Sequence, residues 1–249
     1  MNRDLTFRML VFILSITQFI SPIFSSFNDN QSTNKFDPPI TPAGYTFAVW
    51  GIITLLGLCY GIYQLIPNRS VADLHQKVAI RISIVYFLFS VWLFAASRDW
   101  LWFTVAVFVI MFGLLFKLFQ IIQNNRQKLT LADKILLEGQ IGIYLGWSTV
   151  AIFANTASAL AYYDLFTVGN TGIFIQATLL ILALLNGIYG ISKTNGNLFL
   201  AATILWAFIG IFVGLKQNSN TEMLQLVVVS AIVVFITYLA FIKLKLTRS

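Results

Sequence analysis

Charged side chains are scarce in this chain of 249 residues, which is 58% hydrophobic and only 10% charged. A soluble domain carries about 25% charged residues, so the composition excludes a protein that folds in water alone. Because hydrocarbon offers a backbone no hydrogen-bond partner, only helices and closed barrels span a membrane. Long apolar runs without a period of two exclude a barrel. The sequence therefore predicts an all-α, polytopic membrane helix bundle.

Cysteine and histidine each occur only once. Cys59 alone forms no disulfide within the chain, and a metal site usually needs several ligands of these kinds. We interpret His75 as a solvated loop residue, and we expect neither a metal nor a resident cofactor. The chain also lacks a serine–histidine–aspartate set and a phosphate-binding glycine loop. We therefore predict no catalytic residue and a protein that is not an enzyme.

Acidic residues number only nine, and all lie in loops or near the ends of the apolar runs. Ion-driven pumps commonly hold ionisable groups at mid-membrane. Their absence there disfavours a proton-driven transporter and leaves a passive carrier open. No basic cluster sits on a soluble segment that could grip a duplex, which excludes a nucleic-acid partner.

Apolar runs of the length that crosses a bilayer are the dominant feature. If all of them cross, only three of the 16 Lys and Arg residues fall on the side opposite the N-terminus, namely Lys35, Arg98 and Lys216. The positive-inside rule then predicts a multi-pass cell-membrane protein with both termini cytoplasmic, its net charge facing membrane lipids. The first run resembles a signal peptide but lacks an A-x-A-like cleavage site, so we expect it to be retained. The eight runs are Met9–Phe24, Tyr45–Ile66, Val78–Ala96, Trp100–Ile122, Ile141–Tyr162, Gly172–Ile191, Leu198–Leu215 and Met223–Leu244.

Polar and aromatic groups share one face of the fifth run. Tyr144, Trp147, Ala151 and Asn155 are spaced i, i+3, i+7 and i+11, which aligns them along one side of a helix. An amide in hydrocarbon costs a few kcal/mol without a partner, so Asn155 should face protein or ligand. The alternative is that Asn155 simply bonds a neighbouring helix.

Prolines and rings precede the second run in the stretch DPPITPAGYTFAVW. Proline restricts the backbone and its preceding residue, so the segment should be stiff. Tyr45, Phe47 and Trp50 then enter the membrane. Such a segment suits a lid over the outer mouth of the bundle, and an aromatic belt at the membrane interface is the alternative.

Glycines four residues apart occur in three runs, and such pairs let helices approach closely. We expect them to pack helices within one chain, and a homodimer is the alternative. The pairs are Gly57/Gly61, Gly142/Gly146 and Gly210/Gly214.

The proline stretch resembles the first-loop signature of the TspO/MBR family, the tryptophan-rich sensory or translocator proteins. The fifth run is similar to that family's Tyr-x-x-Trp-x-x-x-Ala-x-x-x-Asn pattern, and Trp92 matches a family tryptophan in the third helix. The departures are a spacing from Phe47 to Trp50 that is one residue short, Thr54 in place of tyrosine, and Phe89 in place of asparagine. The resemblance covers about residues 5 to 165.

The resemblance implies a TspO-like five-helix ligand-binding bundle in residues 1–165, with three additional spans of unknown role in residues 166–249. It also implies a pocket under the first extracytoplasmic loop for a planar hydrophobic ligand, such as a tetrapyrrole or a sterol-like lipid. The alternatives are a passive or facilitated transporter of these molecules and a porphyrin-degrading enzyme. The residues carried over or placed beside them as ligand-binding are Pro42, Tyr45, Phe47, Trp50, Trp92, Tyr144, Trp147, Ala151 and Asn155.

Overall fold

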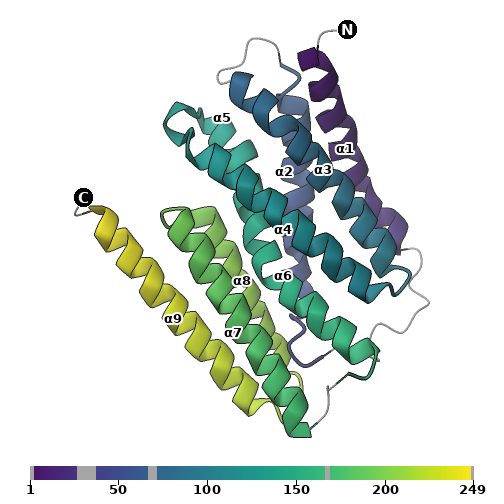
Figure 1. Cartoon of the computed structure of the whole chain (residues 1–249), viewed down its shortest axis with the longest axis vertical. Helices are drawn as coiled ribbons and strands as arrows, with labels where there is room; N and C mark the ends of the chain where they lie inside the picture. The colour runs from purple at the N-terminus through teal and green to yellow at the C-terminus, as the bar shows by residue number, and fades with distance from the viewer. Residues whose placement is uncertain (1–2, 27–37, 67–71, 166–168, 248–249) are drawn as a thin grey trace. The chain divides into compact units, whose positions relative to one another are not determined.

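A computed structural model describes residues 3–26, 38–66, 72–165 and 169–247 (Figure 1). This part of the chain is helical and contains no strand. It holds eight helices that are long and apolar enough to cross a membrane. The predicted all-α bundle with eight spans is therefore confirmed, and the chain is a multi-pass membrane protein. Of the three cations assigned to the outer side, Lys35 lies outside the described residues.

Two of the spans are built from more than one element. The second span joins a 3₁₀ turn to α2, and the fifth joins α5, a π-helical turn and α6. The elements are α1 (Arg3–Ser26), η2 (Gly44–Ala48), α2 (Val49–Tyr63), α3 (Ala72–Ala96), α4 (Leu101–Gln123), η3 (Arg126–Lys128), α5 (Leu131–Asp133), η4 (Lys134–Gly139), α6 (Gln140–Tyr162), α7 (Gly169–Lys193), α8 (Leu198–Leu215) and α9 (Glu222–Thr247).

The chain divides into two compact units. Unit 1 comprises the described residues of 1–31 and 49–145, and unit 2 those of 32–48 and 146–249. The division of roles between residues 1–165 and 166–249 stays a prediction.

Unit 1 is a helical bundle in which α1 packs against α2 and α3, and α3 packs against α4 (Figure 1). Gly61 allows the closest of these approaches. A Cβ at this position would overlap the Ser15 side chain and lie 3.4 Å from Phe12 Cα, both on α1. This glycine therefore packs helices within one chain, as expected for its pair.

Unit 2 holds α7, α8 and α9, with α9 packed against both of the others (Figure 1). Gly146 of α6 lets α8 approach, because a Cβ there would lie 2.8 Å from the Leu200 carbonyl oxygen. Asn186 of α7 donates to the Thr149 carbonyl of α6 at 3.3 Å. These contacts join α7 and α8 to the part of α6 that follows residue 145.

Several helices begin earlier than the apolar runs predict, and the early start of α3 corrects the interpretation of His75. The residue lies in the first turns of α3 and is 1% exposed, so its assignment to a solvated loop is wrong. Asp133 and Glu138 likewise lie in the fifth span and are fully buried. Hydropathy detects only the part of a helix that faces hydrocarbon, so it misses polar helix ends that protein covers.

The fifth span is longer than the bilayer requires. Its 32 residues, from Leu131 to Tyr162, span about 48 Å at 1.5 Å per residue. The hydrocarbon core is about 30 Å thick, which matches the apolar run from Ile141 to Tyr162. Asp133 and Glu138 therefore belong to the polar end of the span.

Candidate functional site

The proline segment, residues 38–48, is an ordered turn followed by 3₁₀ helix. The Thr41 amide donates to the Pro38 carbonyl at 2.8 Å, and the Thr46 amide donates to the Ala43 carbonyl at 2.9 Å. Prolines at positions 38, 39 and 42 have no amide hydrogen to satisfy. Few backbone amides of the segment therefore need a hydrogen-bond acceptor elsewhere in the protein.

Helices α7 and α8 supply the remaining hydrogen bonds to this segment. The Ile40 amide donates to Oε1 of Gln176 at 3.2 Å, and the Gln176 side chain is buried. The Ala43 amide donates to the Gly210 carbonyl at 2.9 Å. The indole N–H of Trp206 donates to the Thr46 carbonyl at 3.0 Å. Three bonds thus tie the segment to the C-terminal helices.

Gly210 and Gly214 form the surface on which the segment rests. A Cβ on Gly210 would overlap the Thr46 side chain, and a Cβ on Gly214 would overlap the Thr41 carbonyl oxygen. The Gly214 Cβ would also lie 3.1 Å from the Ala43 nitrogen. This pair packs within one chain, as expected, but its partner is the proline segment rather than a helix.

Two rings of the proline segment contact tryptophans of unit 2. Tyr45 is 49% exposed and meets Trp206 edge to face, with ring centroids 5.5 Å apart. Phe47 is 42% exposed and meets Trp147 edge to face at 5.7 Å. Trp147 itself is 3% exposed, so its ring lies within the protein. The structure thus brings Phe47 and Trp147 together, as the site prediction requires.

Beyond Trp147, the same face of α6 carries first a small side chain and then a polar one. Ala151 is buried, and its carbonyl accepts a hydrogen bond of 2.9 Å from the Asn155 amide. This bond lies within α6, so it does not join neighbouring helices. A bond between helices is made by Asn186, whose amide reaches from α7 to the Thr149 carbonyl of α6.

The other three predicted site residues lie in unit 1, where they belong to one aromatic cluster. The Trp50 ring centroid lies 5.3 Å from that of Trp92 and 5.5 Å from that of Tyr144. Phe89 and Phe108 complete the cluster, at 4.9 Å and 6.2 Å from Trp50. Phe89, which replaces the family asparagine, is almost fully buried among these rings. An apolar ring therefore suits this position better than an amide.

Sequence reasoning missed several residues that build the site. Trp206 and Gln176 hold the proline segment, and Phe108 packs in the aromatic cluster. A tryptophan and a glutamine in apolar runs were visible signals, but no motif assigned them a partner 136 or 160 residues away. Pro42, predicted to bind ligand, is buried with its carbonyl carbon 3.4 Å from a Cβ on Gly214.

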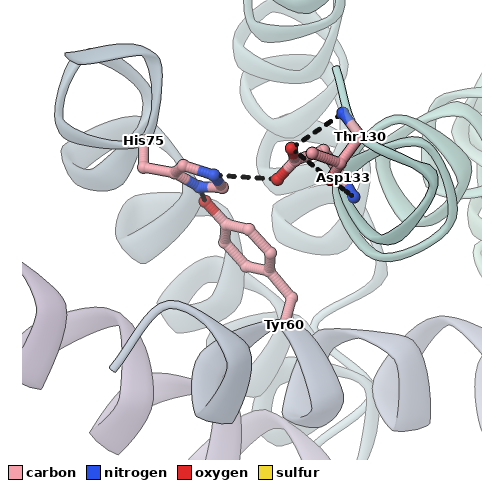
Figure 2. Close-up of polar contacts among 4 residues, drawn as sticks. All are labelled: Tyr60, His75, Thr130 and Asp133. Atoms are coloured by element: carbon pink, nitrogen blue, oxygen red, sulfur yellow. Dashed lines mark hydrogen bonds and ion pairs between the residues drawn. The ribbon is translucent and has the colours of Figure 1, made fainter. Parts of the chain in front are cut away.

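A buried polar chain lies at one end of unit 1 and joins α2, α3 and α5 (Figure 2). Nδ1 of His75 lies 2.9 Å from the Tyr60 hydroxyl, and Nε2 lies 3.0 Å from Oδ1 of Asp133. Oδ2 of Asp133 accepts from the Thr130 amide at 3.1 Å and from its hydroxyl at 2.7 Å. Thr130 in turn accepts from the Asp133 amide, which completes a capping box.

Nε2 of His75 is the donor wherever the Asp133 carboxylate is the acceptor. The Tyr60 hydroxyl can donate to Nδ1 of a neutral ring or accept from Nδ1 of a protonated one. Tyr60, His75 and Asp133 are each at most 1% exposed. The cluster is therefore suited to fastening the ends of α2, α3 and α5 to one another.

Glu138, in the π-helical turn η4, has partners on the preceding connection. Its Oε1 accepts from Nε of Arg126 at 2.9 Å and from Nε2 of Gln123 at 3.0 Å. The side chain of Arg126 is 58% exposed, so solvent screens this pair. No group of three or more His, Cys, Asp and Glu side chains that could hold a metal lies in the described ranges.

A comparison with protein families gives one match for this chain. The family model described as TSPO-like protein matches residues 5–243. The match therefore continues past residue 165, where the resemblance of the first loop and fifth span ends, and takes in α7, α8 and most of α9. Comparison with curated proteins and with solved structures gave no match.

Proposed function

Because the chain belongs to the TSPO-like protein family, we propose that it binds a planar hydrophobic ligand, a tetrapyrrole or a sterol-like lipid, within the membrane. The contact of Phe47 with Trp147 carries this proposal. It joins the proline segment to the tryptophan of the fifth-span pattern, the two stretches on which the family resemblance rests. Phe47 and Trp147 both lie in unit 2.

The chemistry of the nine residues suits such a ligand. Aromatic rings supply a large contact area with few torsions to freeze, and offset or edge contacts between rings add about 0.5–1.5 kcal/mol each. Tyr45 and Phe47 keep roughly half of their surface exposed, which leaves area for a ligand or lipid. None of the nine is an acid, a histidine or a cysteine, and we propose binding without turnover.

Titration of protoporphyrin into the detergent-solubilised protein, followed by the Soret absorbance, tests the proposal. The signal comes from the ligand, so it stays interpretable when a tryptophan is replaced. Phe47→Ala and Asn155→Ala should each weaken binding about fivefold or more, since a lost ring contact or hydrogen bond costs about 1 kcal/mol. Trp147→Phe keeps an aromatic ring in the core and should weaken binding less than Phe47→Ala.

Trp102→Phe is the matched control, because Trp102 is an exposed ring on α4, in unit 1. Its affinity should equal that of the unaltered chain. Equal affinity of all four variants would contradict the assigned site. Loss of the Soret band over time in the dark or in light would instead show turnover, and flux into proteoliposomes would favour the transport alternative.

We further propose that the protein resides in the cell membrane with both termini in the cytoplasm. The distribution of Lys and Arg along the chain supports this orientation. Membrane lipids would then surround the exposed apolar faces of the eight spans.

A further inference from the structure

We propose that α7 and α8 form a rigid seat that presets the rings of Tyr45 and Phe47 for the ligand. The proline segment is then a fixed wall of the site and not a moving lid. The ligand part of this inference rests on the proposed function, whereas the seat rests on contacts within unit 2 alone. It gives the additional helices a role, which is to hold the ligand-facing segment.

The hydrogen bonds of the segment make opening unfavourable. Lifting it from the seat breaks the bonds of the Ile40 and Ala43 amides and of the Trp206 indole. Each of these groups would need a new partner, and a buried donor left without an acceptor is unfavourable. A lid that opens often would need partners in both of its positions.

The fit between backbones points the same way. A Cβ on Gly214 would overlap the Thr41 carbonyl oxygen and crowd the Ala43 nitrogen, and both are main-chain atoms that cannot rotate away. Gly210 faces Thr46, which is fully buried. The seat therefore accepts this segment only at one depth and in one register.

A preset segment improves binding because the ordering of its rings is complete before the ligand arrives. Tyr45 packs on Trp206, and Phe47 packs on Trp147. Substitutions that loosen the seat should therefore weaken ligand binding, although they change no residue assigned to contact the ligand.

Hydrogen–deuterium exchange of the full-length protein in detergent measures the seat directly, in a peptide covering residues 38–48. Gly214→Ala should raise exchange in this peptide about tenfold, the factor that corresponds to about 1.4 kcal/mol of opening free energy. It should also lower protoporphyrin affinity. Gly113→Ala is the matched control, because a Cβ there meets nothing within 4 Å. It should leave both measurements unchanged.

Two rescue variants separate the seat from general damage. Gly210→Ala should loosen the segment, and adding Thr46→Gly should restore protection, since the second change removes the overlapping side chain. Gln176→Leu removes the acceptor of the Ile40 amide, whereas Gln176→Glu keeps an acceptor oxygen. The first should increase exchange and the second should not.

Unchanged exchange in Gly214→Ala and Gly210→Ala would overturn the seat. Rapid exchange of residues 38–48 in the unaltered chain would also contradict the seat, and it would support the alternative that the segment is a moving lid. If the seat variants exchange faster but bind protoporphyrin with unaltered affinity, presetting is wrong. If the unaltered chain binds no protoporphyrin while its segment is protected, the proposed ligand class fails and the seat stands.

Discussion

Asp133 illustrates how much one buried side chain can fasten. It accepts from His75 and twice from Thr130, so three donors converge on one carboxylate at the start of α5. Removing the carboxylate takes away the acceptor of the buried Nε2–H of His75, and leaving such a donor unsatisfied typically costs about 1–3 kcal/mol. A helix cap contributes about a further 1 kcal/mol.

Asp133→Ala should therefore lower the melting temperature in detergent by several degrees, read from intrinsic fluorescence, because the His75 ring loses its acceptor. Asp73→Ala is the control. Asp73 is an exposed acid in the first turn of α3, and its loss should change the melting temperature by little. An equal effect of the two substitutions would show that the buried chain does not fasten the helix ends.

Residue types that the sequence made conspicuous were easier to place than their partners. The pairing of Phe47 with Trp147 follows the family patterns, but the histidine was misplaced because its stabilising partners lie 15 and 58 residues away. Trp206 was overlooked for a similar reason, since its hydrogen bond crosses 160 residues. Local sequence patterns indicate that a side chain needs a hydrogen-bond partner. They do not indicate which residue, distant in the sequence, provides that partner.

At the scale of helices, the glycines of α2 give opposite expectations. Gly61 faces α1, and a Cβ there would overlap Ser15, whereas a Cβ on Gly51 meets nothing within 4 Å. Gly61→Ala should lower the stability by about 1–3 kcal/mol, because overpacking forces α1 and α2 apart. Gly51→Ala should raise it by about 0.5–1 kcal/mol, because alanine favours helix. Thermal unfolding in one detergent compares the two, and a gain of stability in Gly61→Ala would contradict the described packing.

Helix number and type followed from the sequence, but the polar beginnings of α3 and of the fifth span did not. Hydrocarbon forces every spanning segment into a helix, so eight apolar runs became eight helices. The start of α3 and of the fifth span depends instead on polar contacts such as the capping box of Thr130. The Gly210/Gly214 motif was recognised, but a spacing of four cannot tell a membrane-spanning helix from a turn with a short 3₁₀ helix as its partner.

For the whole molecule, the orientation in the membrane is open to a direct test. The connection after the fourth span carries Arg126 and Lys128, and the connection after the seventh carries only Lys216. After an even number of crossings the chain should be inside, and after an odd number outside. The positive-inside rule assigns the same sides.

Single cysteines placed in a Cys59→Ser background should therefore label differently. Ser219→Cys should react with an impermeant maleimide in intact cells, and Gln127→Cys only after permeabilisation. Both positions are exposed in the structure, so burial does not explain a difference. The reverse pattern would place both termini outside the cell and contradict the assigned orientation.

The missing side chains of Gly210 and Gly214 have an evolutionary corollary. In relatives that keep the eight-span arrangement, these two sites and the Pro-x-x-x-Thr stretch from Pro42 to Thr46 should be inherited as a linked set. A lineage that loses α8 would be released from both constraints together. Searching genomes for this distant co-occurrence offers a means to sort long and short members before any of them is purified.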